Sequence, residues 1–255
     1  EVFSALLAQR LPRSRQTNKE VIELMRAFCK AQEYSQQLTD DLSMAAALYN
    51  LGKLTWNDAL IALPPESMDR VQRENYKNYP TTGERLLIAL EPAHDAALII
   101  RHHQERWDGA GFPDGLVGNA IPFGARVLKL VVDFVEMKMG MVFARKVPHE
   151  EMVEKMPKYA GRLYDPELCA AFIELVKRLE EEKEAESEDV VTHNTSTLRP
   201  EMTIARSLHA QNGMLLLKEG TIITERLINK LKDFEENEET QYVIHVLQVL
   251  QDEDA

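Results

Sequence analysis

The residues best suited to metal binding or catalysis lie in the segment 99–128, which reads IIRHHQERWDGAGFPDGLVGNAIPFGARVL. His102 and His103 end one helical pattern, Glu105 follows, and Asp108 and Asp114 lie in a loop rich in Gly and Pro. Imidazole and carboxylate groups this close can bind metal ions, and adjacent histidines can reach two ions if both face one cleft. Alternatively, the segment is a structural loop whose charged and aromatic side chains join two helices. Spacing alone favours the structural loop and leaves the metal site open.

The elements that must position this loop are predicted to be helices. Apolar residues recur at intervals of three and four over 21–28, 127–135 and 168–179, as on the buried face of a helix. Asp165 and Pro166 are typical of the start of the last helix. No segment of residues 1–180 alternates long enough to form a strand, so we expect a helical bundle there.

The remaining sequence predicts a linker and a second, smaller domain. Residues 180–189 read EEEKEAESED, and repulsion among these acidic groups opposes compaction. We therefore expect a linker over 181–197, although the acidic run can also extend the preceding helix. Over 198–255, turn residues separate short apolar runs, which predicts hairpins, and Thr224 precedes an amphipathic helix over 225–234. The predicted fold class is mainly α, a helical bundle with a small C-terminal α+β module of hairpin and helix.

Composition restricts the classes of partner. The net charge of −12 argues against nucleic acid or an anionic membrane as a partner. No apolar run approaches the ~18 residues of a membrane span, and no signal peptide opens the chain. Cys29 and Cys169 lie inside helical patterns without the spacing of a zinc site, so we expect reduced thiols and a cytoplasmic protein. The chain begins without Met inside a helical pattern, so we expect a fragment of a longer protein.

Residues 103–128 resemble the signature of HD-GYP domains, which is usually close to HHERWDGSGYPDGLKGEEIPLGARIL. Three further segments match that family in order. AAALYNLGK at 45–53 resembles AALLHDIGK, YPTTG at 79–83 resembles HPEIG, and YDPEL at 164–168 resembles FDPEL. The resemblance spans about residues 20–178. It implies the helical bundle of the HD-domain phosphohydrolase superfamily, in a degenerate form with Tyr-Asn where the family has His-Asp.

The resemblance also implies an activity whose metal ligands are missing here. The family hydrolyses cyclic di-GMP with two or three iron or manganese ions held by His and Asp side chains. In this register the ligand positions are occupied by Tyr49, Asn50, Tyr79, Gln104 and Val132. His103 remains as a vestigial ligand, and His102 can substitute only if the helix shifts by one residue. We therefore expect no catalytic residue and no bound metal, with iron or manganese as the alternative.

Two acidic residues lie beside the lost ligand of the helix after the loop. Asp133 and Glu136 fall outside the apolar stripe over 127–135, so we expect both on a solvated helix face.

Two other surfaces follow from the resemblance. Lys53 and Arg145 match basic residues of the family, and with His103 they form a candidate site for cyclic di-GMP. The family loop is implicated in contacts with diguanylate cyclases, which makes the loop a candidate partner surface. Its rings can instead pack against the bundle. The candidate partner-binding residues are Trp107, Asp108, Gly111, Phe112 and Pro113.

The leading hypothesis is a catalytically inactive output domain of a bacterial response regulator in cyclic di-GMP signalling, which acts by protein–protein interaction. A receiver-like domain is expected before Glu1, and homo-oligomers stay open. Alternatives are a residual metal-dependent phosphodiesterase and a sensor that binds cyclic di-GMP without cleaving it. The C-terminal segment 198–224 resembles a small module found after such domains, to which we assign no chemistry. There Glu201 replaces a usual Gly, which leaves the backbone of that turn in question.

Overall fold

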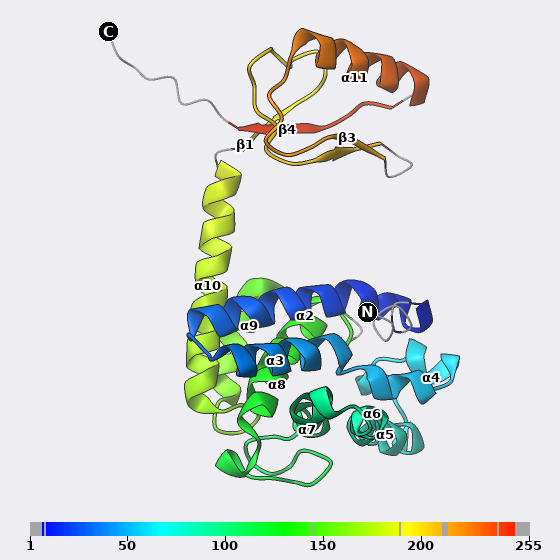
Figure 1. Cartoon of the computed structure of the whole chain (residues 1–255), viewed down its shortest axis with the longest axis vertical. Coiled ribbons are helices and arrows are strands. Elements are labelled where there is room, and N and C mark those ends of the chain that lie inside the picture. Colours follow the sequence, from blue (N-terminus) through cyan, green and yellow to red (C-terminus); the bar gives the residue numbers. More distant parts are fainter. Residues whose placement is uncertain are drawn as a thin grey trace. The chain divides into compact units, whose positions relative to one another are not determined.

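A computed structural model describes residues 7, 9–143, 145–188, 190–210, 214–238 and 240–247. The chain divides into two compact units, one up to Lys177 and one from Arg178. Helices make up most of the first unit, and the described strands belong to the second (Figure 1). This confirms the predicted fold class, a helical bundle with a small α+β module. None of the described helices is both long and apolar enough to cross a membrane.

The first unit is built from α-helices joined by short 3-10 turns. In chain order these elements are α2 (Pro12–Ala31), α3 (Gln36–Leu48), η1 (Leu51–Thr55), α4 (Asp58–Ala62), η2 (Pro65–Ser67), α5 (Arg70–Lys77), α6 (Tyr79–Leu87), η3 (Glu91–Ala93), α7 (His94–His102), η4 (Gly118–Ala120), α8 (Phe123–Lys138), α9 (His149–Lys155), η5 (Met156–Tyr159) and α10 (Pro166–Glu188), whose residues from Arg178 onward are assigned to the second unit. α2 packs along α3 and α8, and α7 packs against α3, α6 and α8 (Figure 1).

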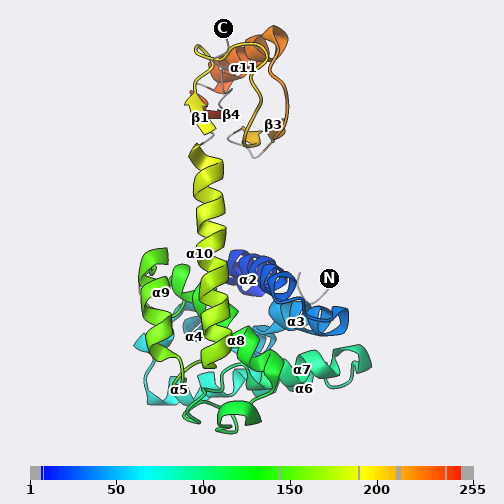
Figure 2. The ribbon, with the colours of Figure 1, turned by 90° about the vertical axis from the view of Figure 1, so that its left-hand side faces the viewer.

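Aromatic rings from three helices form the centre of this bundle. Phe172 of α10 lies 5.4 Å from Phe28 of α2 and 5.5 Å from Phe134 of α8, measured between ring centroids. Both pairs are edge-to-face, an arrangement worth about 0.5–1.5 kcal/mol beyond the burial of area. These contacts hold the first turns of α10 beside α8 (Figure 2). As predicted, α10 begins at Pro166, where Asp165 accepts backbone N–H bonds from the first turn.

The elements that carry the candidate site meet at their ends. Tyr49 and Asn50 follow the last turn of α3, and η1 then passes against the start of α6. This approach is close enough to require glycine, because a Cβ on Gly52 would lie 1.9 Å from the carbonyl oxygen of Tyr79. α7 packs on α3 and α6, and α8 packs on α3 and α7. Residues far apart in the sequence therefore share one buried region.

The expected linker over 181–197 has regular structure over much of its length. Residues 181–188 continue α10, and the ion pair of Arg178 with Glu182, one helical turn apart, offsets part of the acidic repulsion. Val190–His193 then form strand β1. This strand pairs with β4, near the other end of the unit, so its local sequence could not reveal it.

The second unit consists of two antiparallel strand pairs and a helix. β1 pairs with β4 (Ile244–Leu247), β2 (Leu208–His209) pairs with β3 (Leu215–Leu217), and α11 spans Glu225–Glu238. The β2–β3 pair confirms the predicted hairpin, although its Asn-Gly turn lies outside the described residues. Apolar side chains from β3, α11, β4 and the connecting segments form a separate core, which comprises Leu198, Ile204, Leu217, Ile223, Ile228, Leu231, Tyr242, Ile244 and Val246. Glu201 has a φ of 73°, the left-handed conformation that favours glycine.

Candidate functional site

The two residues at the position of the family's His-Asp pair are buried and hydrogen-bonded to protein groups. The hydroxyl of Tyr49 donates to Oε1 of Glu136, 3.1 Å away. Nδ2 of Asn50 donates to Oδ1 of Asn18 on α2, 3.1 Å away. Burial, and then the charge of Glu136, raises the pKa of Tyr49 well above its usual value of 10. Tyr49 is therefore a neutral phenol, which is a poor ligand for a divalent ion.

Both ring nitrogens of His103 have hydrogen-bond partners. Its Nδ1 lies 2.6 Å from the carbonyl oxygen of Ile100, which can only accept, so Nδ1 carries the proton. Its Nε2 therefore accepts from the hydroxyl of Tyr79, at 2.8 Å. That hydroxyl in turn accepts from Nε2 of Gln104, at 2.9 Å. The three polar side chains satisfy one another, and the only lone pair of the imidazole is used.

Burial keeps this histidine neutral. Its side chain is fully buried, and this burial, with smaller contributions from the charges of Lys129 and Lys53, lowers the pKa of His103 to about 3. The hydrogen bond to Ile100 acts in the opposite direction and is outweighed. Tyr79 also stays protonated, since burial raises its pKa well above 10.

A buried ion pair lies beside these residues. Nζ of Lys53 is 3.4 Å from Oε1 of Glu136, and both side chains are almost inaccessible to solvent. The same ammonium lies 4.7 Å from the ring centroid of Tyr79, which adds a cation–π contact. The expectation of a solvated Glu136 was wrong, because α3 and η1 cover this side of α8 and supply both hydrogen-bond donors. Lys53 is thus neutralised within the protein.

Asp133 was also expected on a solvated face and is instead bonded to neighbouring side chains. It accepts a hydrogen bond from the hydroxyl of Tyr164 at 3.1 Å and pairs with Lys129 at 3.0 Å. Its side chain is only 19% exposed. The spacing of apolar residues did not predict this burial, because other elements cover α8 on more than one face. Its polar side chains therefore contact protein groups instead of water.

The residues at the family's ligand positions do not fit a cluster of divalent metal ions. Val132 is apolar and fully buried. The side chains of Tyr49, Asn50, Tyr79 and Gln104 are neutral, and their hydrogen bonds run to protein groups. A cluster of two or three divalent ions needs several imidazole or carboxylate donors converging on it. His103 is the only such group among these positions, and its Nε2 accepts from Tyr79.

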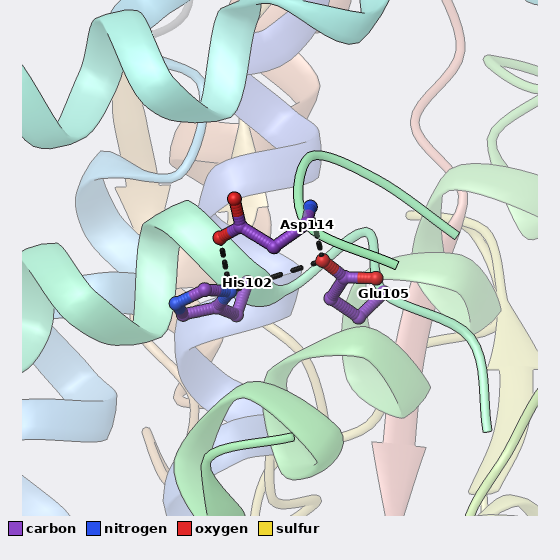
Figure 3. Close-up of side chains that lie close together, drawn as sticks. All are labelled: His102, Glu105 and Asp114. Carbon is purple, nitrogen blue, oxygen red and sulfur yellow. Dashed lines mark hydrogen bonds and ion pairs between the residues drawn. The ribbon is translucent and has the colours of Figure 1, made fainter. Parts of the chain in front are cut away.

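The adjacent histidine, His102, faces a different set of groups. Its Nδ1 lies 3.5 Å from Oδ2 of Asp114 and 3.9 Å from Oε1 of Glu105 (Figure 3). Because it points to the loop after α7, His102 does not replace the family ligand at Gln104. Burial lowers the pKa of His102, although the charge of Asp114 acts to raise it.

Glu105 organises the loop, a role that the sequence did not single out. It is almost fully buried, and its carboxylate accepts backbone N–H groups from Asp114 at 2.7 Å, Gly115 at 3.1 Å and Leu116 at 3.2 Å. Three N–H bonds of this kind replace the water that the carboxylate loses on burial. The family signature could have indicated this role, since it also has Glu directly before Arg-Trp-Asp-Gly.

Four of the five loop residues predicted for partner binding are half-buried, and Asp108 is exposed. The ring of Phe112 contacts Tyr76 edge-on at 6.1 Å, and the guanidinium of Arg126 lies 5.8 Å from the ring of Trp107. The alternative that the rings pack onto the bundle therefore has direct contacts in its favour. The remaining candidates are exposed Asp108 and the half-buried residues Gly111 and Pro113.

The structure does not bring together the three residues of the candidate cyclic di-GMP site. Lys53 lines a cavity of about 410 Å³ with Trp56, Tyr76 and Glu136. Arg145 lines a different cavity, of about 580 Å³, and is paired with Glu151 at 2.6 Å. His103 is fully buried and contacts neither solvent nor these cavities.

Comparison with known proteins agrees with this architecture. The family model of the HD domain matches residues 1–168, about two thirds of the chain. The chain belongs to the HD domain family. The HD domain is 28% identical over 163 residues to a cyclic di-GMP phosphodiesterase of Thermotoga maritima, a match that covers 63% of this chain and 44% of that protein. It is 30% identical over 142 residues to the cyclic di-GMP phosphodiesterase response regulator RpfG of Xanthomonas campestris pv. campestris, covering 55% and 37%.

Solved structures share the fold of this HD domain. A cyclic GMP-AMP specific phosphodiesterase from V. cholerae aligns with a TM-score of 0.53 and 18% identity, covering 69% of this chain and 47% of that one. An HDG"Y"P protein from Bdellovibrio bacteriovorus aligns with a TM-score of 0.52 and 20% identity, covering 65% and 52%. The chain spans less than half the length of the two curated relatives. It is homologous to cyclic di-GMP phosphodiesterases of the HD-GYP type.

Proposed function

We propose that the HD domain of this chain is a degenerate HD-GYP domain that does not hydrolyse cyclic di-GMP and acts by binding other signalling proteins. The observation that carries the proposal is the hydrogen bond from the hydroxyl of Tyr79 to Nε2 of His103. In a metal-dependent hydrolase, that nitrogen would have to be free to bind an ion. Here a protein hydroxyl occupies it, and the second hydroxyl at the site, Tyr49, is bonded to Glu136.

The charges of the site support the loss of catalysis. Phosphodiester hydrolysis by a metal cluster requires ions that generate hydroxide and neutralise the phosphate. The ligand positions of this domain carry neutral side chains, and Lys53 is paired with Glu136. An anionic dinucleotide would have to compete with that buried carboxylate for the ammonium group. We therefore propose a protein, and not cyclic di-GMP, as the main binding partner.

The loop after α7 is the proposed docking surface. Glu105 fixes its backbone, and a β-bridge between Asp108 and Val117 closes it. Asp108 is exposed, and Val117 is 61% exposed although it is apolar, so the bridge presents a rigid surface with an apolar contact point. Diguanylate cyclases are the proposed partners, and the intact protein is proposed to be a cytoplasmic response regulator.

This proposal is tested by surface plasmon resonance against immobilised diguanylate cyclase domains. Val117→Glu is expected to weaken binding by at least about tenfold, since a charge at the centre of an apolar contact costs 2 kcal/mol or more, as an order of magnitude. Val71→Glu is the matched control, because Val71 is 70% exposed on α5. Equal effects of the two substitutions, or no binding by the unmodified chain, would contradict docking through the loop.

The alternative of a cyclic di-GMP sensor has its own measurement. Lys53 lines a cavity that also contains the rings of Trp56 and Tyr76, which is the observation that favours a bound ligand there. Calorimetric titration with cyclic di-GMP would then give a saturable isotherm that Lys53→Glu abolishes. The interaction proposal predicts no such isotherm.

A further inference from the structure

His102 and the loop that follows it form a small polar cluster outside the region of the lost ligands. The side chain of His102 is 9% exposed, and its Nδ1 is buried without a hydrogen-bond partner among the described residues. That nitrogen points at the carboxylates of Glu105 and Asp114 (Figure 3). A buried nitrogen without a hydrogen-bond partner destabilises the fold, so its orientation toward two anions needs an explanation.

We propose that His102, Glu105 and Asp114 bind one divalent transition-metal ion with the ligand preference of Zn²⁺. One ligand atom from each residue lies within 4.8 Å of the other two. Zn²⁺ binds imidazole nitrogen and carboxylate oxygen at about 2.0–2.2 Å in a tetrahedral arrangement, which places ligand atoms roughly 3.4 Å apart. The separations of 3.5 Å and 3.9 Å from Nδ1 to the two carboxylates are therefore close to those of a bound site.

The charge balance of the cluster favours a cation. The charged groups that act on His102 are Glu84, Glu105, Asp114 and Arg101. Three of these are anionic and one is cationic, so the cluster around the neutral imidazole carries two excess negative charges. A single divalent ion would neutralise this excess. Asp114 is 37% exposed and provides a route for the ion from solvent.

The groups around the two carboxylates set their roles in this site. Arg101 donates to both oxygens of Asp114 at 2.9 Å and pairs with Glu84 at 2.6 Å, which fixes the orientation of Asp114. Such outer contacts orient metal ligands in many sites. Oε1 of Glu105 already accepts two backbone N–H groups, so we expect Glu105 to provide the longest bond. Repulsion by Arg101 limits the affinity.

The bound ion would have a structural effect that is distinct from phosphodiester hydrolysis. It would join the last turn of α7 to both ends of the loop segment between Glu105 and Asp114. The docking surface proposed above would thereby become more rigid when the metal is bound. The site does not involve His103 or the other ligand positions of the HD-GYP family, so its occupancy is independent of the loss of catalysis.

The test is titration of the metal-free chain with Zn²⁺ by calorimetry, with Co²⁺ as a spectroscopic reporter of coordination. We expect one ion per chain and weakening of at least about tenfold in both His102→Gln and Asp114→Asn, since loss of an outer contact alone costs 10–100-fold. Asp114→Asn retains an acceptor for Arg101, so it keeps the test valid if His102→Gln misfolds. His94→Ala is the matched control, because His94 is exposed on the same helix.

Stoichiometric uptake that falls in the two site variants and persists in His94→Ala would support the site. Absence of stoichiometric uptake would overturn the proposal. Uptake that is unchanged in both site variants would also overturn it, since the ion would then bind elsewhere. Cyclic di-GMP turnover plays no part in these outcomes, so they do not depend on the proposed function.

Discussion

Removal of Lys53 tests whether its buried ion pair with Glu136 contributes to the stability of the fold. The substitution Lys53→Met keeps most of the apolar stem and deletes the ammonium group. The carboxylate of Glu136 is then left with the hydroxyl of Tyr49 as its hydrogen-bond donor among the described residues. Both side chains of the pair are nearly inaccessible to solvent, with exposed fractions of 11% and 6%.

The expected cost follows from this burial. Breaking a buried pair by removing one partner costs about 3–5 kcal/mol, because a charge stays behind without compensation. We expect about 3 kcal/mol, the lower end, since the pair is separated by 3.4 Å and Tyr49 still donates to Glu136. The double substitution Lys53→Met/Glu136→Leu leaves no buried charge and should cost no more than either single change.

Urea unfolding followed by tryptophan fluorescence measures these costs in the HD domain alone. Trp56 and Trp107 are the two tryptophans of the chain, and both lie in the first unit. With a slope of about 2 kcal/mol per molar urea, a loss of about 3 kcal/mol lowers the midpoint by roughly 1.5 M. Lys138→Met is the control, since Lys138 pairs with Glu20 at the surface and should cost about 1 kcal/mol or less. Equal costs for Lys53→Met and Lys138→Met would refute the reasoning, as would a double substitution that costs the sum of the single ones.

Three other predictions follow from the same region and from the core. His103 has a folded pKa of about 3, below its usual 6.5, so the unfolded chain takes up the proton first. Stability should therefore fall by about 1.4 kcal/mol per pH unit as pH drops below about 6, relative to His103→Gln, in urea titrations at pH 7 and 5. Glu105→Gln replaces one acceptor oxygen with an NH₂ group facing the loop N–H donors, so it should cost about 2 kcal/mol and expose Arg106 to trypsin, which limited proteolysis detects. Burial raises the pKa of Cys29 and raises that of Cys169 to about 11, so Ellman's reagent should modify both thiols only in urea, and rapid modification of the native chain would contradict their burial.

Much of the fold follows from periodicity and from local start signals. The three apolar stripes predicted helices where α2, α8 and α10 lie, and Asp165-Pro166 marked the start of α10. The hairpin of the second unit was visible because turn residues separate apolar runs. The strand β1 was not, because its four residues are too few to show an alternating pattern and it pairs with β4, more than fifty residues away. Pairing partners so distant in sequence leave no local pattern.

The sequence predicted which residues form the candidate site but not which groups they contact. The register with the HD-GYP signature predicts which residues stand at the ligand positions, and in the structure Tyr49, Asn50, Tyr79, His103 and Val132 are buried while Gln104 is half-buried. It could not indicate that Tyr79 donates to His103, because that depends on how α6 and α7 pack. Glu136 was misjudged for the same reason, since its partners lie on α3 and η1. A polar residue beside an apolar stripe is solvated only if no other element covers it.

The most direct test of the proposed loss of catalysis is an anaerobic hydrolysis assay. The purified chain is reconstituted with ferrous iron or manganese and incubated with cyclic di-GMP, and linear product is quantified by chromatography. The phosphodiesterase of Thermotoga maritima serves as the positive control. The variant His102→Gln shows whether any turnover depends on a metal ion bound by His102, Glu105 and Asp114. We predict no product above a blank that contains metal alone. Metal-dependent turnover that His103→Ala abolishes would contradict the account, because His103 would then be a working ligand instead of the acceptor for Tyr79.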